Sequence, residues 1–238
     1  MRKTIRTWWS LHPRPGNLGD ILTPILLRNY GYFPERVARE EAEWLFVGST
    51  IRFARPGAYV VGSGAISMQD RLEPRAKYLA VRGPLTASLV RNCGVESPSI
   101  QGDPALLLPR FIRSKAAKEC ELGLIPHYID RADPRVLAWR GRPINVLWAN
   151  PLEVIDQITR CEAVLSSSLH GIILSHAYGV PAAWVRLGDR LDGDDTKFHD
   201  YAASVGLSLR PYARFEEAVP VLPRTIDTEP LHQLFASL

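Results

Sequence analysis

Short apolar runs alternate along this chain with segments whose apolar residues recur at helical spacing. The runs are rich in β-branched and aromatic residues and predict buried strands at 4–11, 44–49, 58–64, 78–83, 122–127, 144–149, 163–168 and 182–187. The helical patterns cover 21–31, 84–94, 151–160, 169–179, 200–207 and 212–222. A strand that is followed by a helix and then by another strand favours parallel pairing, so this order predicts parallel sheets covered by helices.

The alternation stops at a charged stretch, residues 113–121, and then starts again. Two successive runs of this kind predict an α/β protein with two Rossmann-like lobes and a cleft between them. We expect the lobes to span residues 1–114 and 115–238, with the helical tail packed back on either of them. At 238 residues the chain is long enough to bury a substantial core.

Charge and hydropathy exclude several functional classes. The formal charge of +4 comes from 24 Arg and 5 Lys against 25 acidic residues, scattered without a basic run or a nucleic-acid-binding motif, so we expect no nucleic-acid partner. No apolar run has the length of a membrane span and residues 1–16 lack the pattern of a signal peptide, which leads us to expect a cytoplasmic protein. Cys93, Cys120 and Cys161 lack metal-ligand spacing, so we expect neither a zinc site nor a disulfide framework.

Small and polar residues follow most of the predicted strands, on the sheet edge where ligands of open parallel sheets bind. The richest cluster is SSSLHG, where the hydroxyls of Ser166, Ser167 and Ser168 and the free N–H groups of a helix start predict an anion site. His170, in the first helical turn, could then donate a hydrogen bond or a proton to the bound anion. The alternative is that a serine caps the helix and His170 satisfies a buried backbone group.

A glycine-containing loop, PGNLGD, follows the first predicted strand. Gly16 and Gly19 permit close approach of the backbone, and Asn17 and Asp20 could point into one cleft because they are three residues apart. The loop lacks the Gly-Lys-Ser/Thr of a nucleoside triphosphate site. The alternative is that Asp20 or Thr23 caps the following helix, with Pro24 at the first helical position in the latter case.

Four motifs stand in order along residues 10–210: GNLGD at 16–20, VRGPLT at 81–86, QGDPALLLP at 101–109 and SSSLHGIILSHAYGVPA at 166–182. Together they resemble the exopolysaccharide branch of the polysaccharide pyruvyl transferase family. The resemblance implies two lobes like those of the GT-B glycosyltransferase fold, phosphoenolpyruvate as donor, and a pyruvate ketal formed on a sugar of an exopolysaccharide or lipid-linked oligosaccharide. It implies no cofactor, and a lipid-linked acceptor would bring the protein into peripheral contact with a membrane.

The resemblance also implies roles for residues of this chain. His170 is implied as the acid that protonates the methylene carbon of the donor, and Asp20 or Asp103 as the base. An arginine, together with the serines, would bind the phosphate and the carboxylate of the donor. The resemblance also implies Asn17, Arg82, Ser168 and Leu169 as substrate-binding residues. The sequence pattern itself adds the candidates Gly19, Ser166, Ser167, Arg186 and Lys197.

The chain departs from the family pattern at Ser168, because many members carry arginine just before Leu-His. Arg82 or Arg186 would then supply the missing charge. The acidic loop 188–200 lacks the offsets of an EF-hand, so we expect no metal there and read it as a solvated lid whose Lys197 brings positive charge over the cleft.

Two other functions stay open at this point. One is a GT-B-like glycosyltransferase that uses a nucleotide sugar, since it would share the two lobes and the anion-binding helix start. The other is a non-catalytic sugar-binding or scaffold protein of polysaccharide assembly, to which the loss of the arginine at Ser168 points.

Overall fold

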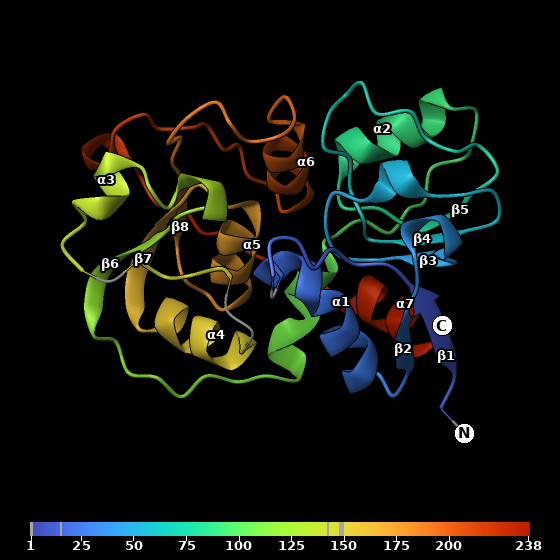
Figure 1. Ribbon diagram of the computed structural model, residues 1–238, viewed down its shortest axis with the longest axis horizontal. Coiled ribbons are helices and arrows are strands. Elements are labelled where there is room, and N and C mark those ends of the chain that lie inside the picture. The colour runs from blue at the N-terminus through green and yellow to red at the C-terminus, as the bar shows by residue number, and fades with distance from the viewer. Residues whose placement is uncertain (1, 15, 142, 148–149) are drawn as a thin grey trace.

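The computed structural model describes residues 2–14, 16–141, 143–147 and 150–238, and two parallel sheets organise the chain (Figure 1). The first sheet has five strands in the order β2-β1-β3-β4-β5, and every neighbouring pair is parallel. Its strands are β1 (Thr4–Thr7), β2 (Phe33–Arg36), β3 (Trp44–Leu45), β4 (Tyr59–Val61) and β5 (Lys77–Ala80).

The second sheet has three strands in the order β6-β7-β8, which are also parallel. They are β6 (Cys120–Ile125), β7 (Cys161–Ser166) and β8 (Ala182–Trp184). Cys120 and Cys161 are register partners on β6 and β7, and their free thiols lie 2.8 Å apart, although the two residues are far apart in sequence. The α/β class with parallel strands is as expected.

Helices surround the sheets, and their ends follow local sequence signals. Pro84 and Pro151 lie in the first turns of their helices, where no backbone N–H is needed, and the Asn150 side chain accepts the Leu152 N–H. The α-helices are α1 (Leu18–Asn29), α2 (Pro84–Asn92), α3 (Pro134–Leu137), α4 (Pro151–Thr159), α5 (Leu169–Ala177), α6 (Thr196–Ser204) and α7 (Glu229–Ala236), with 3₁₀ segments that include η2 (Ile51–Phe53), η3 (Pro104–Arg110) and η5 (Phe215–Glu217).

Helix α5 lies near the middle of the molecule, beside α1 in Figure 1, and its residues 169–176 are all buried. A helix that is apolar on most sides must be covered on most sides, and α5 packs against η3, α6, β7 and β8. The largest hydrophobic cluster accordingly includes residues of both sheets, from Ile5 on β1 to Trp184 on β8.

The tail returns to the first sheet. The ring of Phe235 on α7 lies 5.3 Å from that of Tyr30 and 5.4 Å from that of Phe46, measured between centroids, and Phe235 is fully buried. Helix α6 packs against α2. Both helices therefore connect the end of the chain to the half that contains β1–β5.

The structure differs from the sequence-based expectation in several elements. The edge strand β2, η3 and α7 were not predicted, and 212–222 holds only the short η5. The predicted strand 144–149 is absent over 144–147, where the Val146 carbonyl instead accepts the Leu18 N–H of α1; residues 148 and 149 lie outside the described residues. Most of the observed strands are shorter than predicted, and most end before the small and polar residues that were included in the predicted runs.

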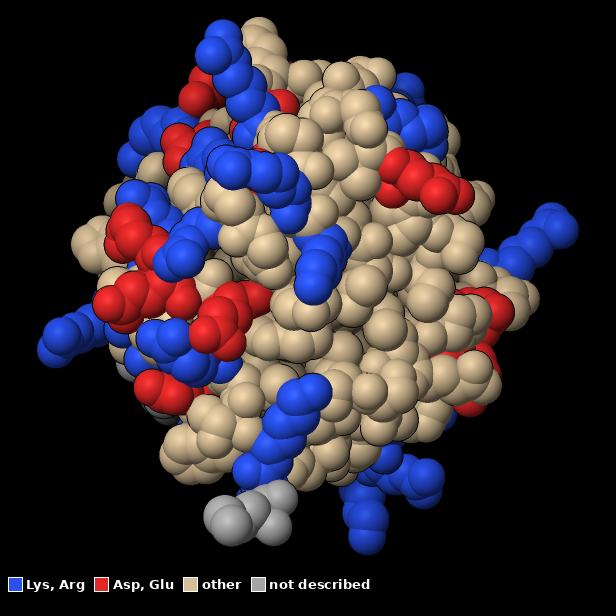
Figure 2. Space-filling view, turned by 90° about the vertical axis from the view of Figure 1, so that its right-hand side faces the viewer, with Lys and Arg blue, Asp and Glu red and all other residues tan. Residues whose placement is uncertain are grey.

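The surface agrees with the scattered charge of the sequence. On the face shown in Figure 2, Lys and Arg side chains lie among Asp and Glu side chains and do not gather into one patch. Within the described ranges, no helix is both long enough and apolar enough to cross a bilayer.

Candidate active site

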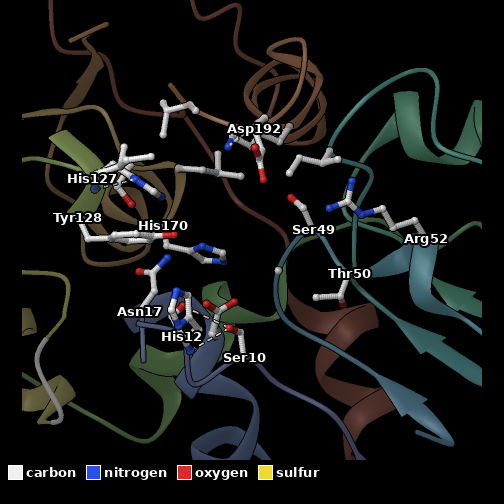
Figure 3. Close-up of a pocket in the computed structure, with 18 of the residues that line it drawn as sticks. Ser10, His12, Asn17, Ser49, Thr50, Arg52, His127, Tyr128, His170 and Asp192 are labelled. Atoms are coloured by element: carbon white, nitrogen blue, oxygen red, sulfur yellow. Dashed lines mark hydrogen bonds between the residues drawn. The ribbon is translucent and has the colours of Figure 1, made fainter. Parts of the chain in front are cut away.

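A cavity of about 290 Å³ opens between the two sheets, at the carboxyl ends of their strands (Figure 3). Loops after β1 and β3 form one wall, and loops after β6, β7 and β8 form the other. Strand ends that are distant in sequence thus meet at one place, as expected for open parallel sheets. Of the expected site residues, those that line the cavity are Asn17, Asp20, Ser168, Leu169, His170 and Lys197.

His170 lies in the first turn of α5 and faces Asp103. Its Nε2 atom is 3.7 Å from Oδ2 of Asp103, and neither atom has a hydrogen-bond partner among the described residues. The other carboxylate oxygen of Asp103 accepts the Ala105 N–H at 2.9 Å and begins η3, so Asp103 caps a helix and also faces the imidazole. Two buried polar atoms without partners are costly unless a ligand or a shared proton satisfies them, which favours a functional role for this pair.

Gly19 lies beneath the His170 ring. A Cβ atom at this position would overlap Nδ1 of His170, so the backbone of α1 approaches the imidazole more closely than any other residue type allows. Gly19 itself does not belong to the described cavity lining. Its contribution is to leave room for His170.

Asp20 and Asn17 reach the cavity from the start of α1. Burial raises the pKa of Asp20 to about 6, against the opposing effect of a charged His170, so this carboxyl can exchange a proton near neutral pH. Asn17 is the N-cap residue but makes no side-chain cap bond, and its Oδ1 has no partner in the described part of the chain. The alternative that Asp20 or Thr23 caps the helix is wrong, because both residues lie within α1.

The three serines divide into two groups. Ser166 Oγ accepts the Ser168 N–H and lies 3.0 Å from the Ile125 carbonyl oxygen, while Ser167 donates to Oδ2 of Asp130 at 2.7 Å. These hydroxyls connect the β7–α5 turn to the neighbouring loop, so the expected cradle of three hydroxyls is corrected to Ser168 alone. Ser168 is the N-cap of α5, makes no side-chain cap bond and lines the cavity.

Arg82 is fully buried and does not belong to the described cavity lining. Its Nε donates to Oδ2 of Asp200 at 3.1 Å, Nη1 donates to Oγ of Ser49 at 2.8 Å, and Nη2 donates to the Ala65 carbonyl. All three nitrogens are thus engaged. The expectation that Arg82 binds the donor directly is therefore corrected. Arg82 pairs with Asp200 on α6 and orients Ser49, and Ser49 does line the cavity.

Arg186 also lies outside the described lining. It pairs with Asp195 and lies near Asp189, beside Trp184 in a neighbouring depression. Neither arginine that was expected to replace the family arginine therefore reaches the cavity directly.

Other cations do reach it. Arg52, in η2, and Arg190, in the loop after β8, line the cavity with Lys197, and the carboxylate oxygens nearest the two guanidinium groups are no closer than 3.8 Å. Burial and the charge of Arg82 lower the pKa of Lys197 to about 8. Burial, with the charges of Lys197 and His170, lowers the pKa of His127 to about 4. Burial is the larger cause of both shifts, and neighbouring positive charges add to it.

Sequence reasoning missed Arg52 and Arg190. Each follows a polar cluster after a strand, GST and RLGD, which was the available signal. In the described ranges, no three His, Cys, Asp or Glu residues gather in a way that could hold a metal ion.

Comparisons with known proteins give a consistent result. The family model of polysaccharide pyruvyl transferase matches residues 47–189. An uncharacterized protein of Acanthamoeba polyphaga mimivirus is 32% identical over 179 residues, which cover 71% of this chain and 62% of that protein. The succinoglycan biosynthesis protein ExoV of Rhizobium meliloti is 29% identical over 217 residues, covering 86% and 65%. The chain thus spans less than two thirds of the length of both relatives.

A solved structure of a functionally uncharacterized protein from Klebsiella pneumoniae is also similar. It superposes with a TM-score of 0.49 at 15% sequence identity, over 84% of this chain and 88% of that one.

Proposed function

Because this chain belongs to the polysaccharide pyruvyl transferase family, we propose that it transfers the pyruvyl group of phosphoenolpyruvate to two hydroxyls of a sugar. The acceptor in this proposal is an exopolysaccharide or a lipid-linked oligosaccharide, and the relative named for succinoglycan biosynthesis supports that class. The observation that carries the proposal is that His170, which faces the buried Asp103, lines a cavity that is also lined by three cationic side chains.

The reaction needs an acid, a base and groups that bind two anions. A proton adds to the methylene carbon of phosphoenolpyruvate, which becomes the methyl group, while positive charge develops at the carbon that bears the phosphate. Two sugar oxygens bond to that carbon and the bond to the phosphate oxygen breaks. Of the two hydroxyl protons, one balances the proton on the methyl group and the other leaves with phosphate.

In this proposal, the His170 imidazole delivers the proton to the methylene carbon. The Asp103 carboxylate, whose Oδ2 lies 3.7 Å from Nε2 of His170, orients the ring. Asp20 accepts a proton from an acceptor hydroxyl, because a pKa of about 6 allows it to be ionised at neutral pH and still basic enough to take part. The unpartnered Oδ1 of Asn17 accepts a hydrogen bond from the acceptor.

The anions of the donor are bound by Arg52, Arg190 and Lys197, in place of the arginine that stands at Ser168 in many family members. Ser168 and the free N–H groups of α5 add hydrogen bonds from the helix start. We also propose that residues 1–114 and 115–238 form the two lobes of a GT-B-like fold, since the two sheets lie in these ranges and the cavity lies between them.

Ligand-induced thermal stabilisation tests the donor. Phosphoenolpyruvate should raise the melting temperature, whereas uridine diphosphate should not, because binding to the folded state alone stabilises it. Stabilisation by uridine diphosphate instead of phosphoenolpyruvate would favour a nucleotide-sugar glycosyltransferase, and stabilisation by neither would leave a non-catalytic sugar-binding protein. Release of phosphate from phosphoenolpyruvate in the presence of acceptor sugars then tests the transfer itself.

A further inference from the structure

Two aromatic side chains lie in the wall of the cavity that the first sheet supplies. Trp8 follows β1 and Phe53 ends η2, and their rings pack edge to face with centroids 5.6 Å apart and an interplanar angle of 83°. Both line the cavity and both are partly exposed. The proposed pyruvyl transfer assigns neither ring a role.

The two walls of the cavity differ in chemistry. Arg190 and Lys197 come from the half that contains β6–β8 and give that wall two cationic side chains, next to Asp192 and to His127, whose lowered pKa of about 4 leaves it neutral near pH 7. The opposite wall carries Trp8 and Phe53, with Arg52 as its cation; the Arg52 guanidinium lies 5.0 Å from the centre of the Phe53 ring. One wall therefore suits a small anion, and the other offers aromatic surface that a small anion does not need.

Polar groups lie around the floor between these walls. His12 and Ser10 come from the loop that also carries Trp8, and Asn17 lies beside His170 (Figure 3). Asn17 Oδ1 is buried and has no hydrogen-bond partner within the described ranges. His12 is exposed to solvent.

A pyranose ring has an apolar face of C–H groups and an edge of hydroxyls, so it binds well where an aromatic face adjoins hydrogen-bonding groups. We propose that Trp8 and Phe53 form the platform on which the acceptor sugar stacks, with His12 and Asn17 binding its hydroxyl edge. This assignment rests on the proposed function for the identity of the acceptor. It places the sugar against the aromatic wall, and the donor anions between Arg52 of that wall and Arg190 and Lys197 of the opposite wall.

The adjacent residue Trp9 provides a matched control, because it is not one of the described lining residues and instead lies beneath the Arg36 guanidinium, 5.9 Å away. The probes are methyl β-D-glucopyranoside and methyl β-D-galactopyranoside at millimolar concentration. Binding is read by saturation-transfer difference NMR, which detects weak complexes. Phosphoenolpyruvate binding is measured separately, by thermal stabilisation.

We expect saturation transfer to the ring protons of at least one glycoside with the parent protein and with Trp9→Ala. In Trp8→Ala the affinity should fall about fivefold or more, the worth of one aromatic contact, and Trp8→Phe should restore part of it. Stabilisation by phosphoenolpyruvate should be the same in all four proteins. Phe53→Leu should show the same selective loss and replaces Trp8→Ala if that variant fails to fold.

Three results would overturn the proposal: no transfer to either glycoside in the parent protein, full transfer in Trp8→Ala, or an equal loss in Trp8→Ala and Trp9→Ala. The experiment has another outcome if pyruvyl transfer is wrong but the sugar platform is right. In that case the glycosides still bind through Trp8, but phosphoenolpyruvate gives no stabilisation and no phosphate is released.

Discussion

Replacing Asp200 with asparagine should strongly destabilise the fold, because it leaves the Arg82 charge buried without a counter-charge. Both side chains are fully shielded from solvent, and Arg82 Nε lies 3.1 Å from Oδ2 of Asp200. The same carboxylate accepts the Thr86 N–H at 2.9 Å and the Thr86 hydroxyl at 2.6 Å. Breaking a buried ion pair of this kind costs about 3–5 kcal/mol. Asparagine keeps one acceptor oxygen, so we expect about 3 kcal/mol.

Urea denaturation followed by circular dichroism measures this loss. For a chain of this size, about 3 kcal/mol corresponds to a fall in melting temperature of roughly 6–12 °C. Asp189→Asn is the control, because the Asp189 side chain is 94% exposed and 3.9 Å from Arg186; surface pairs of this kind contribute about 1 kcal/mol or less. If Asp200→Asn were as stable as Asp189→Asn, the Arg82 charge would not depend on Asp200, and Arg82 would again be a candidate for gripping the donor.

Three further predictions concern the cavity. His170→Ala should keep the fold and phosphoenolpyruvate binding while turnover falls by about 10²–10⁴, the usual contribution of a positioned acid; an active variant would remove the proposed acid. Native Asp20, with its pKa raised from 3.8 to about 6, binds a proton more tightly than the unfolded chain does, so stability should decline as pH rises through this window. Asp20→Asn should flatten that decline in urea midpoints measured from pH 4 to 6, and an unchanged slope would refute the shift. Lys197, with its pKa lowered to about 8, should lose its charge above that pH, so calorimetry should show phosphoenolpyruvate binding weaken there in the parent protein but not in Lys197→Arg.

Local periodicity was sufficient to predict most of the elements that form the cavity. The buried runs that became β6, β7 and β8 and the patterns of α1, α2, α4 and α5 are visible without tertiary information. Strand β2 was missed because three of its four residues are exposed at the edge of the sheet, so Phe33–Arg36 has no apolar run. Helix α7 is short and buries only Leu231 and Phe235, which gives a weak helical pattern.

The site was predicted less completely, for a reason that the arginines make clear. Arg82 was assigned to the donor because its counter-charge, Asp200, is 118 residues away in sequence and could not be seen. Arg52 and Arg190 were missed although each follows a polar cluster after a strand, because that local signal does not say whether an arginine faces a ligand or a carboxylate. Whether an arginine binds a ligand or pairs with a carboxylate depends on contacts between loops of both sheets. These contacts form only in the folded chain.

The return of α7 to the first sheet has a consequence for biosynthesis. A ribosome that has completed β1–β5 has not yet made Phe235, so Phe46 and Tyr30 remain without the ring that covers them until residue 235 has emerged. Until then, the first sheet exposes apolar surface to water. Chaperones bind partly folded chains of this kind, and proteases cut them. For the same reason, we expect a chain that ends between residues 198 and 228 to be less stable, although it carries every described residue of the cavity lining.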